Sequence, residues 1–279
     1  MAWTGKISGT EDPELIIQTP WNLIAKVMGV SSSSLILDFT KISDYYMYAM
    51  DVNPSGDIYG CAANQDIYKK TGEGSFTKLN QTVRQWQCLT ASGSTVFCGT
   101  SNGGDIYKQV GGSGNFTATG VANGYRTSLS AAENGDIYTV DSWRIQKQTG
   151  GSGVFSLYPE QPESQCRIIY VTSRNDIYAT GYSANKLYKQ TGMSGEFVEV
   201  ASVDPSSTDY NFRSLAEDSS GSIYAWQKNG DLYKQFNATG DFVAMNQGPK
   251  ECFSMLIVGN KMYASFGGSM SPGVYVSNM

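Results

Sequence analysis

From residue 35 to the C-terminus, short runs of apolar and aromatic residues are separated by segments rich in Gly, Asn and Ser. One such run is Gly56-Asp-Ile-Tyr59, in which a turn-forming residue precedes an apolar residue and an aromatic one. Related runs recur at residues 95–97, 135–138, 175–178, 221–224 and 260–263. Small residues favour tight turns, and Ile, Val and Tyr favour strands. The pattern therefore predicts short strands repeated at an interval of about 40 residues.

A second strand and a glycine-rich hairpin follow each of these runs. Residues 102–116 read Asn-Gly-Gly-Asp-Ile-Tyr-Lys-Gln-Val-Gly-Gly-Ser-Gly-Asn-Phe, and related segments lie at 64–76, 143–155, 185–197 and 229–242. Small, apolar strands are expected upstream, at 47–50, 89–91, 128–131, 169–171, 214–216 and 256–258. Four short antiparallel strands per repeat, in six repeats, predict an all-β, six-bladed β-propeller over residues 35–279.

The two ends of the chain deviate from the repeat. The sixth copy ends without its last strand, while residues 37–42 resemble the strand segment 74–79. We therefore expect the N-terminal segment to close the last blade and remove an exposed sheet edge. Residues 1–34 form an extension in which 19–29 are predicted to be a helix. Its apolar face, which includes Trp21, Ile24 and Met28, is interpreted as an anchor to a larger assembly, or alternatively as a surface that packs on its own domain.

Composition narrows the possible partners. Charged residues make up 16% of the chain, the net charge is -5 and the pI is about 4.8, so a basic surface for nucleic acid is not expected. Neither a signal peptide nor a membrane-spanning stretch is evident, which predicts synthesis in the cytoplasm without membrane insertion. Five cysteines without metal-site spacing are expected to be buried, reduced thiols, although Cys88 and Cys98 could face each other across a hairpin.

The sequence has no histidine, which excludes Ser-His-Asp and Cys-His catalysis and His-ligated metal sites. No catalytic residue, metal or cofactor is expected. Paired carboxylates for glycoside cleavage are a weakly supported alternative. Acids recur before the Tyr strands, and we interpret them as turn-binding side chains, with calcium binding as the alternative. These acids are Asp57, Asp66, Asp105, Asp136, Asp176 and Asp231.

Large side chains gather in the segments between repeats and in the loops that follow the first Tyr strand. In a propeller these connections share one face, so aromatic and arginine side chains would meet there. Such a face suits recognition of a sugar or a protein, and the alternative is that these side chains wedge neighbouring blades together. The candidate ligand-binding residues are Arg84, Trp86, Tyr125, Arg126, Trp143, Arg167, Tyr182, Arg213 and Trp226.

The Gly-Asp-Ile-Tyr and Lys-Gln-Thr-Gly-x-Ser-Gly-x-Phe repeat resembles the repeats of propeller proteins from tailed bacteriophages, and more distantly those of tectonin-like and tachylectin-like lectin propellers. The resemblance covers residues 35–279. The repeat is degraded at residues 95–97 and 143–146. If the family's repeats form equivalent sugar pockets, at least two of the six would be lost here.

The resemblance implies a non-enzymatic virion structural protein, such as a tail-fibre, tail-tip or head-decoration protein. In this interpretation, residues 1–34 bind other virion proteins and the propeller faces outward, toward a glycan or protein of the host surface. The alternative function is a lectin-type carbohydrate-binding propeller.

Overall fold

The computed structural model describes residues 37–279 apart from 122–123, 182–184, 203–210 and 269. Residues 37–279 form one compact unit. The predicted helix at 19–29, with Trp21, Ile24 and Met28, lies outside the described residues, as does the proposed attachment through residues 1–34. Among the described residues, no helix is long and apolar enough to cross a membrane.

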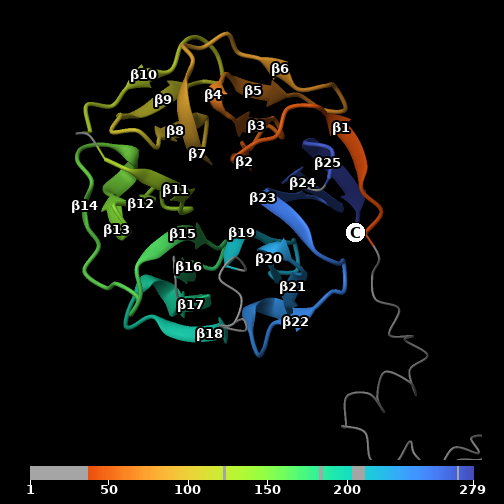
Figure 1. Ribbon diagram of the computed structural model, residues 1–279. Coiled ribbons are helices and arrows are strands. Elements are labelled where there is room, and N and C mark those ends of the chain that lie inside the picture. Colours follow the sequence, from red (N-terminus) through yellow and green to blue (C-terminus); the bar gives the residue numbers. More distant parts are fainter. Residues whose placement is uncertain (1–36, 122–123, 182–184, 203–210, 269) are drawn as a thin grey trace, which may run out of the picture. The chain divides into compact units, whose positions relative to one another are not determined.

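The described chain is all-β and consists of antiparallel strands in sets of four. Figure 1 shows these sets arranged around a common axis, with β2, β7, β11, β15, β19 and β23 nearest to it. The first set contains β2 (Ala49–Val52), β3 (Ile58–Cys61), β5 (Ile67–Lys70) and β6 (Thr77–Lys78). The next contains β7 (Arg84–Ser92), β8 (Thr95–Thr100), β9 (Ile106–Val110) and β10 (Thr117–Ala118), with β4 (Ala63–Gln65) paired to β7.

Two further four-stranded sheets follow in chain order. One contains β11 (Arg126–Ala131), β12 (Ile137–Asp141), β13 (Arg144–Gln148) and β14 (Ser156–Leu157). The other contains β15 (Cys166–Val171), β16 (Ile177–Gly181), β17 (Lys186–Gln190) and β18 (Val198–Ser202).

The remaining strands form an eight-stranded sheet. Its first part contains β19 (Phe212–Glu217), β20 (Ile223–Gly230), β21 (Leu232–Gln235) and β22 (Val243–Ala244). Its second part contains β23 (Lys250–Val258), β24 (Lys261–Gly267), β25 (Gly273–Asn278) and β1 (Thr40–Ser43), and β20 pairs with β23 to join the two parts.

The repeated glycines make the tight turns that the sequence predicts. Gly56, Gly135 and Gly221 precede β3, β12 and β20 with φ angles of 81°, 85° and 78°. Asn175 occupies the same place before β16 with φ 63°. A left-handed backbone is accessible to Gly at little cost and is tolerated by Asn, which explains this choice of residues.

The repeated acids bind turns, as predicted. Asp136 accepts a hydrogen bond from Gly150 N at 2.9 Å and pairs with Lys147 Nζ at 2.6 Å. Asp176 repeats this arrangement with Gly192 N at 3.0 Å and Lys189 Nζ at 2.7 Å. Each acid thus connects the turn before one strand to the loop that follows the next strand.

The glutamine of the Lys-Gln pair closes the following hairpin. The Nε2 atoms of Gln109, Gln148, Gln190 and Gln235 donate to backbone carbonyls five residues later, at 2.6 to 2.7 Å. The carbonyls belong to Gly114, Gly153, Gly195 and Gly240. The most regular part of the sequence therefore encodes a hairpin.

The N-terminal strand closes the C-terminal part of the ring. β1 pairs with β25, and Thr40 lies opposite Val276. Phe39 also packs against Trp226 and Phe266, with ring centroids 5.9 and 5.1 Å away. The expected pairing of the two ends of the propeller is confirmed.

All five cysteines are buried and none forms a disulfide, so the expectation that they are buried is confirmed. Cys88 lies opposite Gly99, and Cys98 lies opposite Leu89, so the two cysteines do not face each other across the β7–β8 hairpin.

Replacing Phe39 with Ala removes the ring contacts that hold β1 on the sheet. We expect a loss of about 2 kcal/mol, below the cost for a fully buried Phe because Phe39 is half-buried. That loss corresponds to a fall of about 4 to 8 °C in the unfolding midpoint, measured by calorimetry. Val154→Ala, at an exposed position, serves as the control. An unchanged midpoint for Phe39→Ala would show that β1 does not secure the ring.

The turn-binding acids predict a loss of stability in acid. Burial raises the pKa of Asp136, but Lys147 and the hydrogen bonds from Gly150 and Asn134 outweigh it and hold the pKa below its ordinary value. A carboxyl with a lowered folded pKa stabilises above its unfolded pKa, and this stabilisation is lost as pH falls through the folded value. Urea unfolding should therefore show a steep loss of stability below about pH 4.

The same experiment on Asp136→Asn should give a smaller loss between pH 6 and pH 3 than the wild-type chain shows, because the variant has already lost that contribution. Asp241→Asn, at an exposed position, should behave as wild type. Equal pH dependence in all three proteins would contradict the proposed role of Asp136.

Candidate functional site

Each strand nearest the axis has one residue that pairs, across the sheet, with a Tyr or Phe of the next strand in the same set. In three of the sets this pairing is Asp51 with Tyr59, Thr90 with Phe97 and Ser130 with Tyr138. In the other three it is Tyr170 with Tyr178, Ala216 with Tyr224 and Leu256 with Tyr263. The partner is Tyr or Phe in every set, whereas the residue on the axial strand differs from set to set.

Where this axial residue is polar, its oxygen accepts a hydrogen bond from the backbone of the next axial strand. Asp51 Oδ2 accepts from Ala91 N at 2.8 Å, and Thr90 Oγ1 accepts from Ala131 N at 3.0 Å. Ser130 Oγ accepts from Val171 N at 2.9 Å, and Tyr170 OH accepts from Glu217 N at 3.0 Å. We call Asp51, Thr90, Ser130 and Tyr170 the axial ring.

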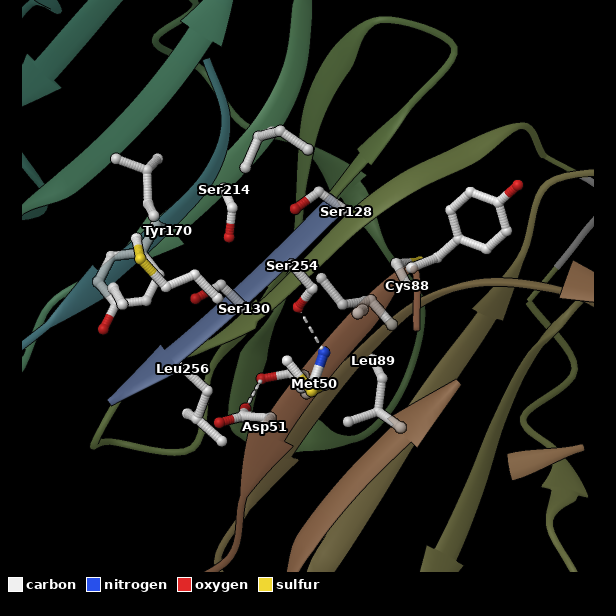
Figure 2. Close-up of a pocket in the computed structure, with 18 of the residues that line it drawn as sticks. Met50, Asp51, Cys88, Leu89, Ser128, Ser130, Tyr170, Ser214, Ser254 and Leu256 are labelled. Carbon is white, nitrogen blue, oxygen red and sulfur yellow. Dashed lines mark hydrogen bonds between the residues drawn. The ribbon is translucent and has the colours of Figure 1, made fainter. Parts of the chain in front are cut away.

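Serines at a neighbouring register position add to these connections. Ser254 Oγ accepts from Met50 N at 2.9 Å, which connects β23 to β2 (Figure 2). Ser128 Oγ accepts from Ile169 N at 3.1 Å. Axial strands from distant parts of the chain are therefore joined by hydrogen bonds from backbone N–H groups to side-chain oxygens.

A cavity lies between the axial strands, and the space within it, including the part open to solvent, is about 700 Å³. Figure 2 shows Asp51, Ser128, Ser130, Tyr170, Ser214 and Ser254 around it, together with the apolar Met50, Leu89 and Leu256. Convergent hydroxyl groups and the carboxyls of Asp51 and Glu217 give the cavity its chemical character.

Asp51 is the axial ring residue with an ionisable carboxyl. Burial raises the pKa of Asp51, while hydrogen bonds from Ala91 N, Val52 N and Thr90 Oγ1 partly oppose the shift. Its Oδ2 accepts two hydrogen bonds, from Ala91 N and Thr90 Oγ1, whereas Oδ1 accepts one, from Val52 N at 2.8 Å. A carboxylate oxygen has two lone-pair positions, so Oδ1 retains capacity to accept a proton or a further hydrogen bond.

Tyr170 and Glu217 extend the polar wall of the cavity. Burial raises the pKa of Tyr170 far above its ordinary value, and the carboxylates of Glu217 and Asp51 add to the shift. Tyr170 is therefore a neutral hydroxyl at physiological pH. Both oxygens of the Glu217 carboxylate accept hydrogen bonds from Ser173, whose N and Oγ donate at 2.7 and 2.9 Å.

The aromatic and arginine residues named from the sequence do not form one face. Trp86, Arg126 and Trp226 are almost completely buried between sheets. Trp86 packs edge-on against Tyr107, and the Trp226 Nε1–H donates to Gly230 O at 3.1 Å. Arg126 NH2 lies 3.7 Å from Asp141 Oδ2. For these three residues the structure shows the wedging role.

The remaining candidates are distributed over several places. Arg84 lies over the ring of Tyr107, and Tyr125 packs against Trp143 with centroids 5.6 Å apart. Arg213 lines the axial cavity, and Arg167 lies at the equivalent position on β15. Tyr182 lies outside the described residues. Sequence reasoning thus named Arg213 but missed Asp51, Thr90, Ser130 and Tyr170.

No group of three or more Asp, Glu or Cys side chains placed to hold a metal ion occurs among the described residues.

Comparison with known proteins gives similarity in structure alone, because neither a family model nor a curated protein matches the sequence. The chain is similar to a gluconolactonase from Xanthomonas campestris, with a TM-score of 0.68 and 8% identity over 86% of this chain and 89% of that one. It is similar to YCF48 bound to a D1 peptide, with a TM-score of 0.61 and 12% identity over 88% of this chain and 97% of that one.

A third similar structure is a catalytically inactive virginiamycin B lyase from Staphylococcus aureus with quinupristin, in which a histidine is replaced by alanine. Its TM-score is 0.60, with 13% identity over 87% of this chain and 99% of that chain. At such identities the similarities establish the β-propeller fold.

These findings correct the functional interpretation of the sequence. The similar structures are gluconolactonase, lyase and YCF48 propellers rather than phage tail proteins, so the assignment to a phage virion protein is wrong. The expectation of a non-enzymatic protein, with its lectin alternative, is also contradicted, since enzymes are prominent among these propellers. The repeat motif misled because it encodes hairpins, which propellers of different function share.

Proposed function

We propose that this chain is an enzyme that hydrolyses a small lactone in the axial cavity, with Asp51 as the group that accepts a proton. The observation that carries the proposal is a half-buried carboxyl with a raised pKa on the wall of a hydroxyl-lined cavity. Titratable groups perturbed by burial within a concave site are characteristic of acid–base catalysis. We also propose that the eight-stranded sheet represents two blades, which gives the propeller six.

The reaction follows from the groups in the cavity. Ionised Asp51 would take a proton from a water molecule as the water oxygen bonds to the lactone carbonyl carbon. The C–O bond of the ring then breaks, the ring oxygen takes up the proton, and a hydroxy acid is released. Hydroxyl groups of Ser130, Ser254 and Tyr170 are available to donate to the oxygen that gains negative charge.

The absence of histidine from this chain favours ester hydrolysis over the chemistry of the lyase. The virginiamycin B lyase with a histidine replaced by alanine is catalytically inactive, and this chain has no histidine. The structural similarity to a gluconolactonase supports a lactone as the substrate class. A carboxyl base requires no histidine.

Asp51→Asn tests the proposal, because asparagine keeps the size of the side chain but cannot act as the base. Hydrolysis of D-glucono-1,5-lactone and γ-butyrolactone, followed by proton release, should fall about 10²- to 10⁴-fold in kcat/KM. Wild-type activity should rise with pH through the raised pKa of Asp51, because the ionised form is the active one.

Ser265→Ala is a matched structural control. Ser265 Oγ accepts a hydrogen bond from Met47 N at 2.6 Å, so its loss also removes a buried connection to a backbone N–H, and Ser265 does not line the cavity. This variant should retain most of the activity. Absence of hydrolysis by the wild-type chain, or full activity in a folded Asp51→Asn variant, would refute the proposed reaction.

A further inference from the structure

The hydroxyl group of Thr90 connects three axial strands. Thr90 lies on β7 and is 2% exposed. Its Oγ1 donates a hydrogen bond to Asp51 Oδ2 on β2 at 2.9 Å. The same oxygen accepts a hydrogen bond from Ala131 N on β11 at 3.0 Å. Thr90 therefore links the carboxyl group of the cavity wall to the backbone of the axial strand on its other side.

The chemistry of the three groups fixes the direction of these hydrogen bonds. The backbone N–H of Ala131 can only donate, and an ionised carboxylate can only accept. The single hydrogen of the Thr90 hydroxyl is therefore directed at Asp51 Oδ2, while a lone pair of Oγ1 accepts from Ala131 N. Both partners hold the hydroxyl group in this orientation.

The two oxygens of the Asp51 carboxylate differ in their remaining capacity for hydrogen bonds. Oδ2 accepts from Thr90 Oγ1 and from Ala91 N at 2.8 Å, which uses both of its lone-pair positions. From the described residues, Oδ1 accepts one hydrogen bond, from Val52 N at 2.8 Å, and keeps a second position. A proton on Oδ2 would leave a buried donor without its acceptor, which is unfavourable. The proton of Asp51 therefore belongs on Oδ1.

Other ionisable groups also surround Asp51. Those that line the cavity with Asp51 or pair with it across the sheet are Tyr48, Tyr59, Cys88, Tyr170, Arg213 and Glu217. Burial raises the pKa of Cys88 and of Tyr170, so both are uncharged at neutral pH. The residues of β23 that line the cavity are not ionisable. None of these groups changes when Thr90 is substituted, so an altered titration of Asp51 in a Thr90 variant reports the lost hydroxyl group.

We infer that Thr90 is a positioning residue for Asp51, whose Oδ2 it holds as a hydrogen-bond acceptor, so that Oδ1 is the oxygen that takes the proton from water. This inference rests on the proposed function, because it specifies how the base of that reaction is oriented. In the reaction, an O–H bond of water breaks as the proton bonds to Oδ1, and the proton then passes from Oδ1 to the ring oxygen of the opened lactone. Thr90 keeps its own hydrogen throughout.

Thr90→Val removes the hydroxyl group while nearly conserving the shape of the side chain. The hydrogen bond from Thr90 stabilises the ionised carboxylate, so its loss should raise the pKa of Asp51 by about 1 to 2, as measured by carbon-13 NMR of the carboxyl groups. Because the ionised form is the base, the pH at which lactone hydrolysis reaches half its maximum should rise equally. Thr90→Ser restores the hydroxyl group and should return both values to those of the wild-type chain.

Thr139→Val is the matched control. Thr139 is 0% exposed, its Oγ1 donates to Ser128 O at 2.9 Å, and it does not line the cavity. This variant also loses a buried hydrogen bond from a threonine, but the pKa of Asp51 and the pH profile should stay as in wild type. If Thr90 were structural alone, Thr90→Val would lower the unfolding midpoint and leave the titration of Asp51 unchanged, and that result would overturn the inference.

The wild-type chain provides a second test that does not depend on the folding of Thr90→Val. The carbon-13 resonance of Thr90 Cβ should move with the same pKa as the carboxyl resonance of Asp51, because the hydrogen bond between them changes when Asp51 is protonated. The Cβ resonance of Thr139 should not follow that titration. A Thr90 resonance that stays constant while Asp51 titrates would contradict the proposed role of Thr90.

The inference and the proposed reaction fail in distinguishable ways. The NMR titrations need no substrate, so a pKa of Asp51 that depends on Thr90 in a chain without lactone hydrolysis would remove only the proposed reaction. Hydrolysis that requires Asp51 but has the same pH profile in folded Thr90→Val would remove only the role of Thr90.

Discussion

The fold depends on hydrogen bonds that connect one axial strand to the next. An antiparallel sheet satisfies its own backbone groups, but neighbouring axial strands form no ladder with each other in the described part of the chain. Here Asp51, Thr90, Ser130 and Tyr170 supply the missing acceptors for backbone N–H groups. The side chains that hold the sheets around the axis are therefore the same ones that make the cavity polar.

At the position of Asp51, a hydroxyl group would be enough to accept the hydrogen bond from the next axial strand, so the carboxyl calls for another explanation. Thr90 and Ser130 accept equivalent hydrogen bonds without a charge. Partial burial of the Asp51 carboxylate is less favourable, because a charged group loses hydration there, and this loss raises its pKa. A residue that costs stability at a structurally replaceable position is a strong candidate for chemistry.

The fold was largely predictable from the sequence, and the candidate site was not. The Gly, Asp and Gln of the repeat act locally, through turns and loop-closing hydrogen bonds such as that of Gln148 with Gly153 O, so their spacing revealed the strands. The axial residues follow no consensus, and their meeting depends on contacts about 40 residues apart in sequence. Trp86 and Trp226 appeared to be recognition residues because sequence alone does not distinguish a buried aromatic side chain from an exposed one.

We propose above all that Asp51 is a half-buried acid–base group on the wall of the cavity. Carbon-13 NMR of the carboxyl groups, assigned with the Asp51→Asn variant, measures its titration directly in the full chain. We predict a pKa above the ordinary value for an aspartate, because burial disfavours the ionised carboxyl. A pKa at or below the ordinary value would show that hydrogen bonds from Ala91 N and Thr90 dominate, and would make Asp51 a structural residue alone.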